Sequence, residues 1–197
     1  IISLFIYNDT NIISFYFFMF NIKKNIMAKL IVVDVEADGP VPPLYSMVSF
    51  GAVVVDKKGI LNETFYGETA PISNLYIPES LAISGFSRKE HEKFNEPLDV
   101  IHEFNDWVKK QGKCIFISDN LAFDWQWINY YFHKYVGSNP FGFSGQRIGD
   151  KFQGFYNDQY YKWKKHRKTA HTHNPVDDAK GNAEALLYLY SQGYKLF

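Results

Sequence analysis

The chain has 197 residues and a formal net charge of zero, because 21 Lys and Arg residues balance 21 Asp and Glu residues. This length suits one domain with a sizeable core, and the neutrality argues against a protein that grips long stretches of duplex nucleic acid. A single cysteine, Cys114, excludes an internal disulfide framework, and we therefore expect a cytoplasmic protein.

Residues 1–26 differ from the rest of the chain because they are rich in Ile, Phe, Tyr and Asn. Asp9 and several Asn residues interrupt this segment, so it lacks the roughly 20 consecutive apolar residues that span a bilayer, and we expect no membrane partner. A regular strand pattern begins only after Met27. We therefore divide the chain into an N-terminal extension (residues 1–26) that does not belong to the native domain and a domain (residues 27–197). An arm that binds a partner or a membrane surface is the alternative role for the extension.

The first half of the domain predicts three strands. Apolar, β-branched runs at 30–35 and 47–55 are typical of strands buried in a sheet. A turn sequence at 56–59 and the strand-like run 60–66 add a hairpin. Between residues 71 and 96 the sequence is rich in loop formers, with one short helix expected at 78–84.

The second half of the domain predicts three helices and one more strand. Apolar residues at helical spacing, with Pro97 near the start, indicate a helix at 97–110. The remaining expected elements follow in chain order: a strand at 114–117, a helix at 120–135, a mostly irregular segment at 138–158, and a last helix that opens at Asn174-Pro175 and ends before Gly193. This order predicts an α/β fold in which helices pack on a mixed sheet.

Asp34 and Glu36 stand two residues apart at the end of the first expected strand. Side chains alternate between the faces of a strand, so these two carboxylates point the same way. A divalent cation such as Mg²⁺ or Mn²⁺ would relieve their repulsion, because such ions prefer oxygen ligands. A solvated, acidic strand end is the alternative interpretation of this pair taken alone.

Two later positions carry further candidate groups. Asp124 lies in the first turns of the second long helix, where an Asp by itself is often only a partner of the helix dipole. His173 precedes the last helix and Asp178 lies inside its first turns, so both can reach one pocket. The neighbouring Asp177 fits a helix-start role, and we expect His171 to be a surface residue or at most a substitute for His173.

Three short patterns thus occur in order along the domain: Asp-x-Glu at 34–36, Asn-x-x-Phe-Asp at 120–124 and His-x-x-x-x-Asp at 173–178. Together they resemble the motifs of the DEDDh exonucleases, a family of proofreading exonucleases, oligoribonucleases and related nucleases. The resemblance spans about residues 29–191 and implies a ribonuclease H-like mixed β-sheet flanked by α-helices. The chain departs from the family in having Asp119 where many members have His, and in a doubled Asp that assigns Asp178 only by its spacing from His173.

The resemblance implies a metal-dependent 3′→5′ exonuclease that hydrolyses phosphodiester bonds at nucleic-acid 3′ ends and releases nucleoside monophosphates. It implies two divalent cations, Mg²⁺ or Mn²⁺, and a set of four metal ligands: Asp34, Glu36, Asp124 and Asp178. Asp34 would bridge both ions. His173 would be the general base that accepts a proton from the attacking water, because an imidazole can do so near neutral pH.

Candidate substrate contacts lie close to these motifs. In the family, the segment after the first strand lines the terminal nucleotide, and here that segment is Ala37-Asp38-Gly39. Asn120 and Phe123, from the second motif, are further candidates for substrate binding. Phe123 lies either under a base or in the core, and the sequence does not separate these two roles.

The segment 160–168 interleaves aromatic and cationic side chains, a pattern that suits stacked bases and phosphates and that also occurs on solvated surfaces. The expected partner is the 3′ end of single-stranded RNA or DNA, and the high aromatic content also fits a homodimer interface. The alternatives are a non-catalytic nucleic-acid-binding module on the same fold, a polymerase-associated proofreading subunit, and a phosphatase or other hydrolase that uses the carboxylates differently. The presence of all four acids and the His favours the exonuclease.

Overall fold

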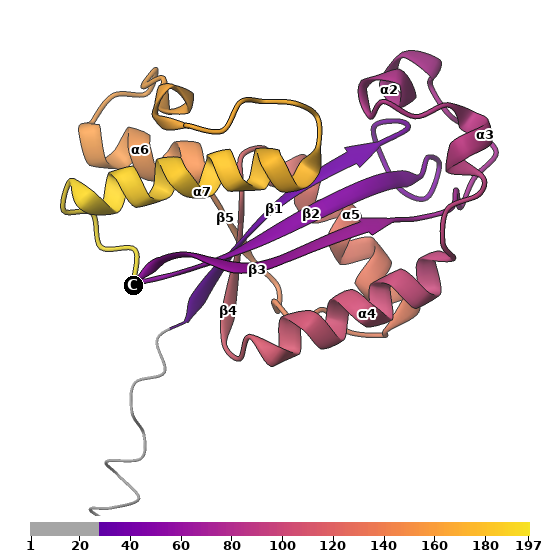
Figure 1. Cartoon of the computed structure of the whole chain (residues 1–197), viewed down its shortest axis with the longest axis horizontal. Coiled ribbons are helices and arrows are strands. Elements are labelled where there is room, and N and C mark those ends of the chain that lie inside the picture. The colour runs from indigo at the N-terminus through magenta and orange to yellow at the C-terminus, as the bar shows by residue number, and fades with distance from the viewer. Residues whose placement is uncertain (1–27) are drawn as a thin grey trace, which may run out of the picture.

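The computed structural model describes residues 28–197 of the chain. Its elements, labelled as in Figure 1, are in chain order β1 (Lys29–Ala37), β2 (Met47–Asp56), β3 (Gly59–Glu68), α2 (Pro78–Ile83), α3 (Arg88–His91), α4 (Pro97–Lys110), β4 (Cys114–Ser118), α5 (Leu121–Tyr135), β5 (Gly145–Arg147), α6 (Ile148–Tyr156), the 3₁₀ helix η1 (Trp163–His166) and α7 (Pro175–Ser191). None of these helices has both the length and the apolar character that crossing a bilayer requires. The expected extension, residues 1–26, and the domain start at Met27 lie outside the described residues.

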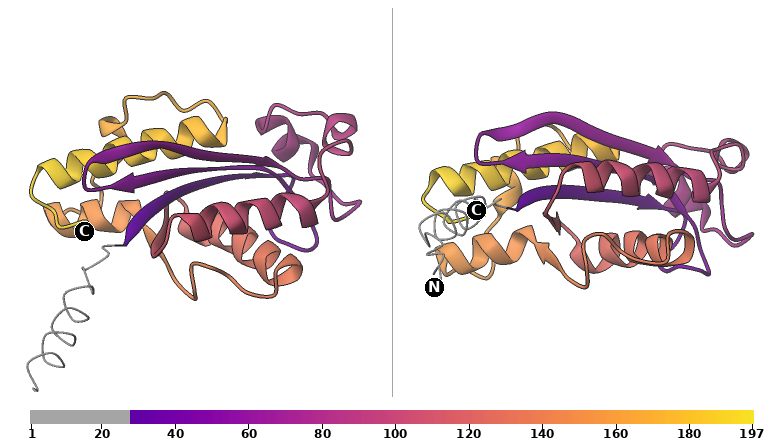
Figure 2. Two further views of the ribbon diagram at one scale, coloured as in Figure 1. Left: turned by 60° about the horizontal axis from the view of Figure 1, so that its bottom comes forward. Right: turned by 90° about the horizontal axis from the view of Figure 1, so that it is seen from below.

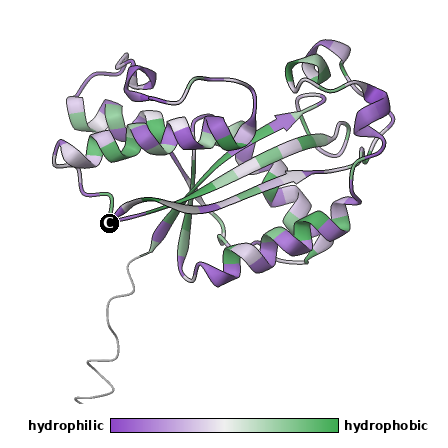
Figure 3. Ribbon diagram, viewed as in Figure 1, coloured by the Kyte–Doolittle hydropathy of each residue, from purple (hydrophilic) through white to green (hydrophobic). Residues whose placement is uncertain are grey.

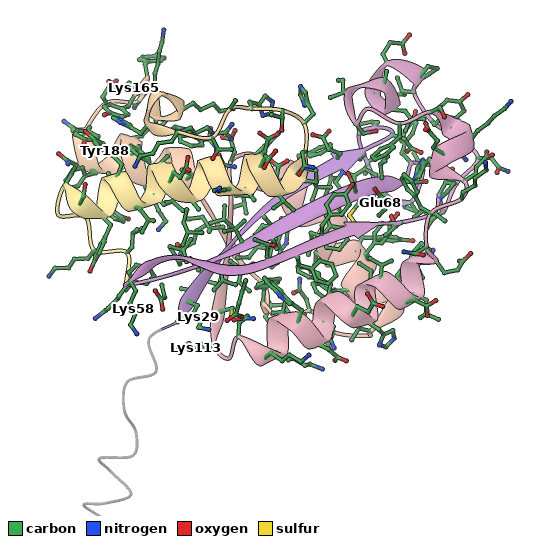
Figure 4. The ribbon with its side chains drawn as sticks, in the orientation of Figure 1. Lys29, Lys58, Glu68, Lys113, Lys165 and Tyr188 are labelled. Atoms are coloured by element: carbon green, nitrogen blue, oxygen red, sulfur yellow. The ribbon has the colours of Figure 1, made fainter. Side chains whose placement is uncertain are left out.

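Five strands form one mixed sheet in the order β3-β2-β1-β4-β5. β1 pairs antiparallel with β2 and parallel with β4, and the ladder between β1 and β4 ends at the pair Val32–Ile117. β1 therefore runs on past its parallel neighbour, and Asp34 and Glu36 lie in this last part of the strand. Lys29, at the start of β1, marks the opposite end of the sheet (Figure 4). Ligands of open α/β sheets bind outside the carboxyl ends of the strands, so the topology favours a site at the acidic end.

Helices cover both faces of the sheet, with α7 on one side and α4 and α5 on the other (Figures 1 and 2). One core packs Phe104 of α4 and Phe132 of α5 against the sheet, and the other packs Phe152 of α6 and Leu186 of α7. The central strands are mostly hydrophobic (Figure 3), as expected for strands that are buried on both faces. The mixed sheet flanked by helices confirms the fold class predicted from the sequence.

The side chains of β1 alternate between these two cores. Val33 and Val35 pack in the core under α4 and α5, whereas Val32 packs in the core under α7. Asp34 and Glu36 continue the series of Val32, so both carboxylates point to the face that α7 covers. The arrangement predicted for this pair is confirmed.

The first turn of α7 lies very close to β2. Asn174 caps the helix, because its Oδ1 accepts hydrogen bonds from the backbone N–H groups of Val176 and Asp177, and Pro175 occupies the first helical position. A Cβ atom at Gly51 of β2 would collide with the backbone of Pro175 and Val176. Gly51 therefore lets the helix start settle directly on the sheet, and this contact brings the third motif to the end of β1.

Two segments differ from the expectations. Residues 138–158, expected to be mostly irregular, contain β5 and α6, because Ile148 and Phe152 are buried in the core shared with α7. The Gly and Ser content that indicated a loop is overridden by this tertiary burial. The loop-rich segment 71–96 forms the expected short helix α2 and also α3, a single turn held by a capping box at Ser87.

Replacement of Gly51 by Ala tests the close approach of β2 and α7. The added methyl group meets backbone atoms that can move only if α7 moves, so we expect the free energy of unfolding to fall by about 1–3 kcal/mol. Gly154→Ala is the matched control, because nothing lies within 4 Å of a Cβ at that position in α6. Urea denaturation of the three proteins measures the difference, and equal stability of Gly51→Ala and the wild type would contradict the steric argument.

Candidate active site

Three carboxylates converge at the carboxyl end of β1. Ligand oxygens from Asp34, Glu36 and Asp178 all lie within 4.8 Å of one another. Asp178 is fully buried, and the side chain of Glu36 is 12% exposed. Carboxylate oxygens at this spacing suit a divalent cation such as Mg²⁺ or Mn²⁺. The fold thus joins the first and third motifs in one candidate metal centre.

The loop before α7 fixes the position of Asp178. The backbone N–H of Thr172 donates to Asp178 Oδ1 at 3.3 Å, and that of His173 donates to Oδ2 at 3.1 Å. His173 has a φ of 60°, in the left-handed region that few non-glycine residues adopt. Two consecutive N–H groups therefore point at one carboxylate and fix its position.

Asp124, in the first turn of α5, reaches the same centre from the second motif. Its Oδ1 accepts a hydrogen bond from the backbone N–H of Val35 at 3.2 Å, beyond the point where β4 stops pairing with β1. Its Oδ2 is buried and has no hydrogen-bond partner among residues 28–197. Burial, together with the charges of Asp119 and Glu36, raises the pKa of Asp124 to about 8. A bound cation would satisfy this orphaned oxygen and remove the penalty of burying it.

The electrostatics of the cluster favour a cation. Burial raises the pKa of Asp34 well above its usual range, and the neighbouring carboxylates raise it further. Burial also raises the pKa of Glu36. The positive charge of Arg167 lowers the pKa of Asp34 and so opposes part of this rise, and its guanidinium also lies 3.9 Å from Asp178 Oδ1. Without a metal the cluster therefore holds protons at a pH at which isolated carboxylates are ionised, and metal binding would release them.

Two histidines lie beside the carboxylates. His173 Nδ1 is 3.4 Å from Glu36 Oε1, and His171 Nδ1 is 2.7 Å from Asp178 Oδ1. Their side chains are 45% and 52% exposed, so both imidazoles can meet solvent and substrate. The sequence indicated His171 as a surface residue or a substitute for His173. It is exposed as expected, but its contact with Asp178 also makes it part of the site, and only its position two residues before His173 could have indicated this.

A cavity of about 340 Å³ opens beside the carboxylates. It is lined by Glu36, Ala37, Gly39, Pro40, Ile77, Ser80, Ile83 and Phe123. Three of the predicted substrate contacts, Ala37, Gly39 and Phe123, therefore share one cavity with a candidate metal ligand. Asn120 does not line this cavity, and its exposed side chain caps none of the N–H groups of α5. The wall that α2 supplies was not predicted, because no sequence pattern connects that helix with the motifs.

Asp38, one of the predicted substrate contacts, has a structural role in the loop after β1. Its side chain is fully buried, and it accepts hydrogen bonds from the backbone N–H of Ser46 at 2.6 Å and from Arg88 Nη1 at 3.2 Å. Arg88 also donates to the carbonyl of Ser73 at 2.8 Å, and the carbonyl of Asp38 accepts from the N–H of Ile77. The Asp38 carboxylate is thus engaged by these partners, and a contact between Asp38 and a nucleotide stays a prediction. It joins the loop after β1 to the segment before α2, the two walls of the cavity.

Residues 29–190 match the family described as the 3′-5′ exoribonuclease Rv2179c-like domain. The chain belongs to this family. It is 34% identical over 167 residues to the 3′-5′ DNA exonuclease Cap18 of Escherichia coli, and the match covers 77% of this chain and 86% of Cap18. Membership in the Rv2179c-like family confirms the prediction of a DEDDh-type 3′→5′ exonuclease.

Solved structures share the fold of this Rv2179c-like domain. A zinc-bound complex of E. coli Exonuclease I with single-stranded DNA has a TM-score of 0.70 at 15% identity over 87% of this chain and 42% of Exonuclease I. A 3′-exonuclease solved on a histone mRNA stem-loop has a TM-score of 0.66 at 16% identity over 84% of this chain and 82% of that protein. At these identities the likeness shows the ribonuclease H-like fold alone, and this chain spans less than half the length of Exonuclease I.

The residues of the candidate site fit a divalent metal. Ligand oxygens of three carboxylates lie within 4.8 Å of one another, and one carboxylate oxygen of Asp124 is buried without a hydrogen-bond partner among the described residues. The neighbouring carboxylates raise the pKa of Asp34, and Arg167 offsets only part of this rise. Zinc-bound Exonuclease I shows that a nuclease of this fold binds a divalent ion. Membership in an exonuclease family therefore implies dependence on a divalent metal.

The raised pKa values predict that the metal-free protein becomes less stable as the pH rises. Asp124 has a pKa of about 8 in the folded state and an ordinary value of 3.8, so between these values the folded state binds more protons than the unfolded chain. The free energy of unfolding should then fall by about 1 kcal/mol per pH unit for each such group. Urea denaturation in EDTA from about pH 4 to about pH 8 measures the slope.

Asp124→Asn is the control for this pH dependence, because the amide has a similar shape and does not titrate. We expect a flatter slope in this variant, and Mg²⁺ should restore stability to the wild type at the upper end of the range. A wild-type slope of the opposite sign, or an unchanged slope in Asp124→Asn, would contradict the assignment of the raised pKa to this carboxyl group.

Proposed function

We propose that this protein is a metal-dependent 3′→5′ exonuclease that hydrolyses the last phosphodiester bond of single-stranded nucleic acid and releases nucleoside monophosphates. The observation that carries this proposal is the convergence of Asp34, Glu36 and Asp178 within 4.8 Å at the carboxyl end of β1. Asp124 and two histidines border the cluster, and a cavity that can accept a nucleotide opens from it. The family and its exonuclease relatives support the same reaction.

The carboxylates have distinct roles in this mechanism. Asp34, at the centre of the cluster, would contribute to holding two ions, Mg²⁺ or Mn²⁺, and Glu36, Asp178 and Asp124 would supply the other protein ligands. When bound, the ions stabilise charge on the attacking and leaving oxygens and lower the pKa of water. The backbone N–H groups that hold Asp178 keep its carboxylate in place during turnover.

His173 is the proposed general base. Its imidazole lies at the rim of the carboxylate cluster, 3.4 Å from Glu36, and is 45% exposed, so it can accept a proton from an attacking water and pass it to solvent. His171 is held more firmly, because its Nδ1 lies 2.7 Å from the buried Asp178. We therefore assign His171 a positioning role beside the base.

The terminal nucleotide is expected in the cavity beside Glu36. Phe123 and Ile83 present apolar surface to a base, and Ala37 and Gly39 line the same cavity beside Glu36. The Asp38–Arg88 ion pair, at 3.2 Å, holds the two walls of this cavity together.

The relatives act on different nucleic acids. The family is described as an exoribonuclease, whereas Cap18 is a DNA exonuclease and Exonuclease I was solved with single-stranded DNA. Single-stranded 3′ ends are therefore the proposed substrate class, and the assay below ranks RNA against DNA. The homodimer and the cytoplasmic location stay predictions from the sequence.

The first test uses 5′-labelled single-stranded RNA and DNA of one sequence, with Mg²⁺, with Mn²⁺ and with EDTA. We expect a ladder that shortens from the 3′ end, needs metal, and is at least about 100-fold slower in Asp34→Asn, because that change removes a charge from the metal centre. The faster substrate identifies the preferred nucleic acid. Folded wild-type protein that shortens neither strand with any metal would favour a binding module or a subunit that needs a partner.

His173→Ala tests the general base, with His171→Ala as the comparison. General-base catalysis contributes about 10²–10⁴-fold, so we expect a loss of turnover in this range for His173→Ala and a smaller loss for His171→Ala. Both variants should still bind metal, measured by calorimetry with Mn²⁺. Turnover of His173→Ala close to that of the wild type would remove this residue from the mechanism, and a larger loss in His171→Ala would exchange the two roles.

A further inference from the structure

A second cavity, of about 310 Å³, borders the loop that runs from η1 alongside α7 to the start of that helix (Figure 1). It is lined by Lys164, Arg167, Lys168, Thr169, Ala170 and His171. Three of these six side chains are permanent cations at neutral pH. The chain as a whole has no net charge, so this concentration of positive charge is local.

The cationic cavity has a fixed wall. Glu184 of α7 accepts hydrogen bonds from the backbone N–H groups of Lys168 and Thr169, each at 2.7 Å, and from Thr169 Oγ1 at 3.0 Å. Arg167 Nε donates to Oδ1 of the buried Asn182 at 3.0 Å, and the Arg167 side chain is only 9% exposed. The loop is therefore held along α7 at several points, and its cations are presented from a rigid support.

The cationic cavity lies directly beside the carboxylates. His171 lines it and also contacts Asp178 at 2.7 Å. The first cavity, in which we place the terminal nucleotide, is bounded by Glu36. The two cavities therefore border the same metal centre through different residues, one largely apolar and one cationic.

The lysines around this cavity differ in their partners. Lys164 Nζ lies 2.5 Å from Asp119, which immediately precedes the second motif, so this ion pair holds η1 near the end of β4. Lys165 lies over the ring of Tyr161 and does not line the cavity; Figure 4 labels it on η1. Lys168 is exposed and forms no ion pair within residues 28–197, which leaves its ammonium group available to an anion.

We propose that the cationic cavity binds the phosphodiester group next to the scissile bond on its 5′ side. This inference rests on the proposed exonuclease function. With the terminal nucleotide in the first cavity and the scissile phosphate at the carboxylates, a continuing strand leaves past His171 toward Lys168. A phosphate in the cationic cavity would contact Lys168 and Arg167, which attract it, whereas the carboxylates of the metal centre repel a phosphate. The cavity thus favours substrates that carry a further phosphate upstream.

Three short substrates isolate this phosphate: a dinucleotide with a 5′-hydroxyl, the same dinucleotide with a 5′-phosphate, and a trinucleotide with a 5′-hydroxyl. Only the last two carry a phosphate upstream of the scissile bond. For the wild type we expect kcat/KM to be about tenfold higher for these two than for the first, the range of a charge-assisted hydrogen bond. The same comparison on Lys168→Gln should reduce this gain to about twofold, since its ammonium group is then absent.

Lys162→Gln is the matched control, because Lys162 belongs to the same basic segment, is exposed and does not line the cavity. It should keep the full gain. An equal loss in Lys162→Gln, a loss in Lys168→Gln that is the same for all three substrates, or a gain seen only with the 5′-phosphorylated dinucleotide would overturn the proposal. The last result would indicate a site for a terminal phosphate.

A longer labelled oligonucleotide separates this inference from the function on which it rests. If the wild type shortens that strand but gains nothing from the upstream phosphate, the phosphate site is refuted and the exonuclease stands. If the wild type shortens no strand under any metal, the exonuclease proposal fails and the phosphate site fails with it.

Discussion

The mutual repulsion of carboxylates confined at the end of β1 is the constraint on which the rest of the structure depends. Asp34 is close enough to Glu36, Asp124 and Asp178 for each of them to raise its pKa, and Asp178 is fully buried. Such a cluster is unfavourable unless protons or cations neutralise it. Backbone N–H groups stabilise Asp178, Arg167 offsets part of the charge, and a divalent metal would offset the rest. The uncompensated negative charge of the cluster therefore favours the binding of a divalent cation.

Several unrelated features of the fold serve to assemble this cluster. β1 extends past its parallel neighbour β4, which leaves the backbone N–H of Val35 available to Asp124. Gly51 lets the start of α7 pack closely against β2, so that Asp178 approaches the end of β1 from the face of the sheet that α7 covers. The loop before α7 is tied back along the helix by Glu184 and therefore carries its histidines to a defined place. Rigid elements, rather than flexible loops alone, hold the groups of the candidate site.

The two cavities divide the recognition of a strand between different kinds of chemistry. The cavity bounded by Glu36 and Phe123 offers apolar surface to a base, whereas the cavity beside His171 offers cations to a phosphate. Asp119 stands where many DEDDh exonucleases have His, and here it forms an ion pair with Lys164 of the cationic cavity. A departure from the family's pattern is therefore used to anchor the basic segment. A neutral protein can in this way attract a polyanion at one place without binding it broadly.

The sequence by itself determined the fold class, the three motifs and the pairing of Asp34 with Glu36 on one face, because strand alternation and helix-start patterns act over a few residues. Tertiary structure alone decided the rest. It buried Asp38 in an ion pair with Arg88, turned part of the segment 138–158 into β5 and α6, and placed His171 on Asp178. These outcomes depend on contacts between residues far apart in the chain or on backbone turns that set side-chain direction. Local composition carries no information about such contacts, so only the packed structure could reveal them.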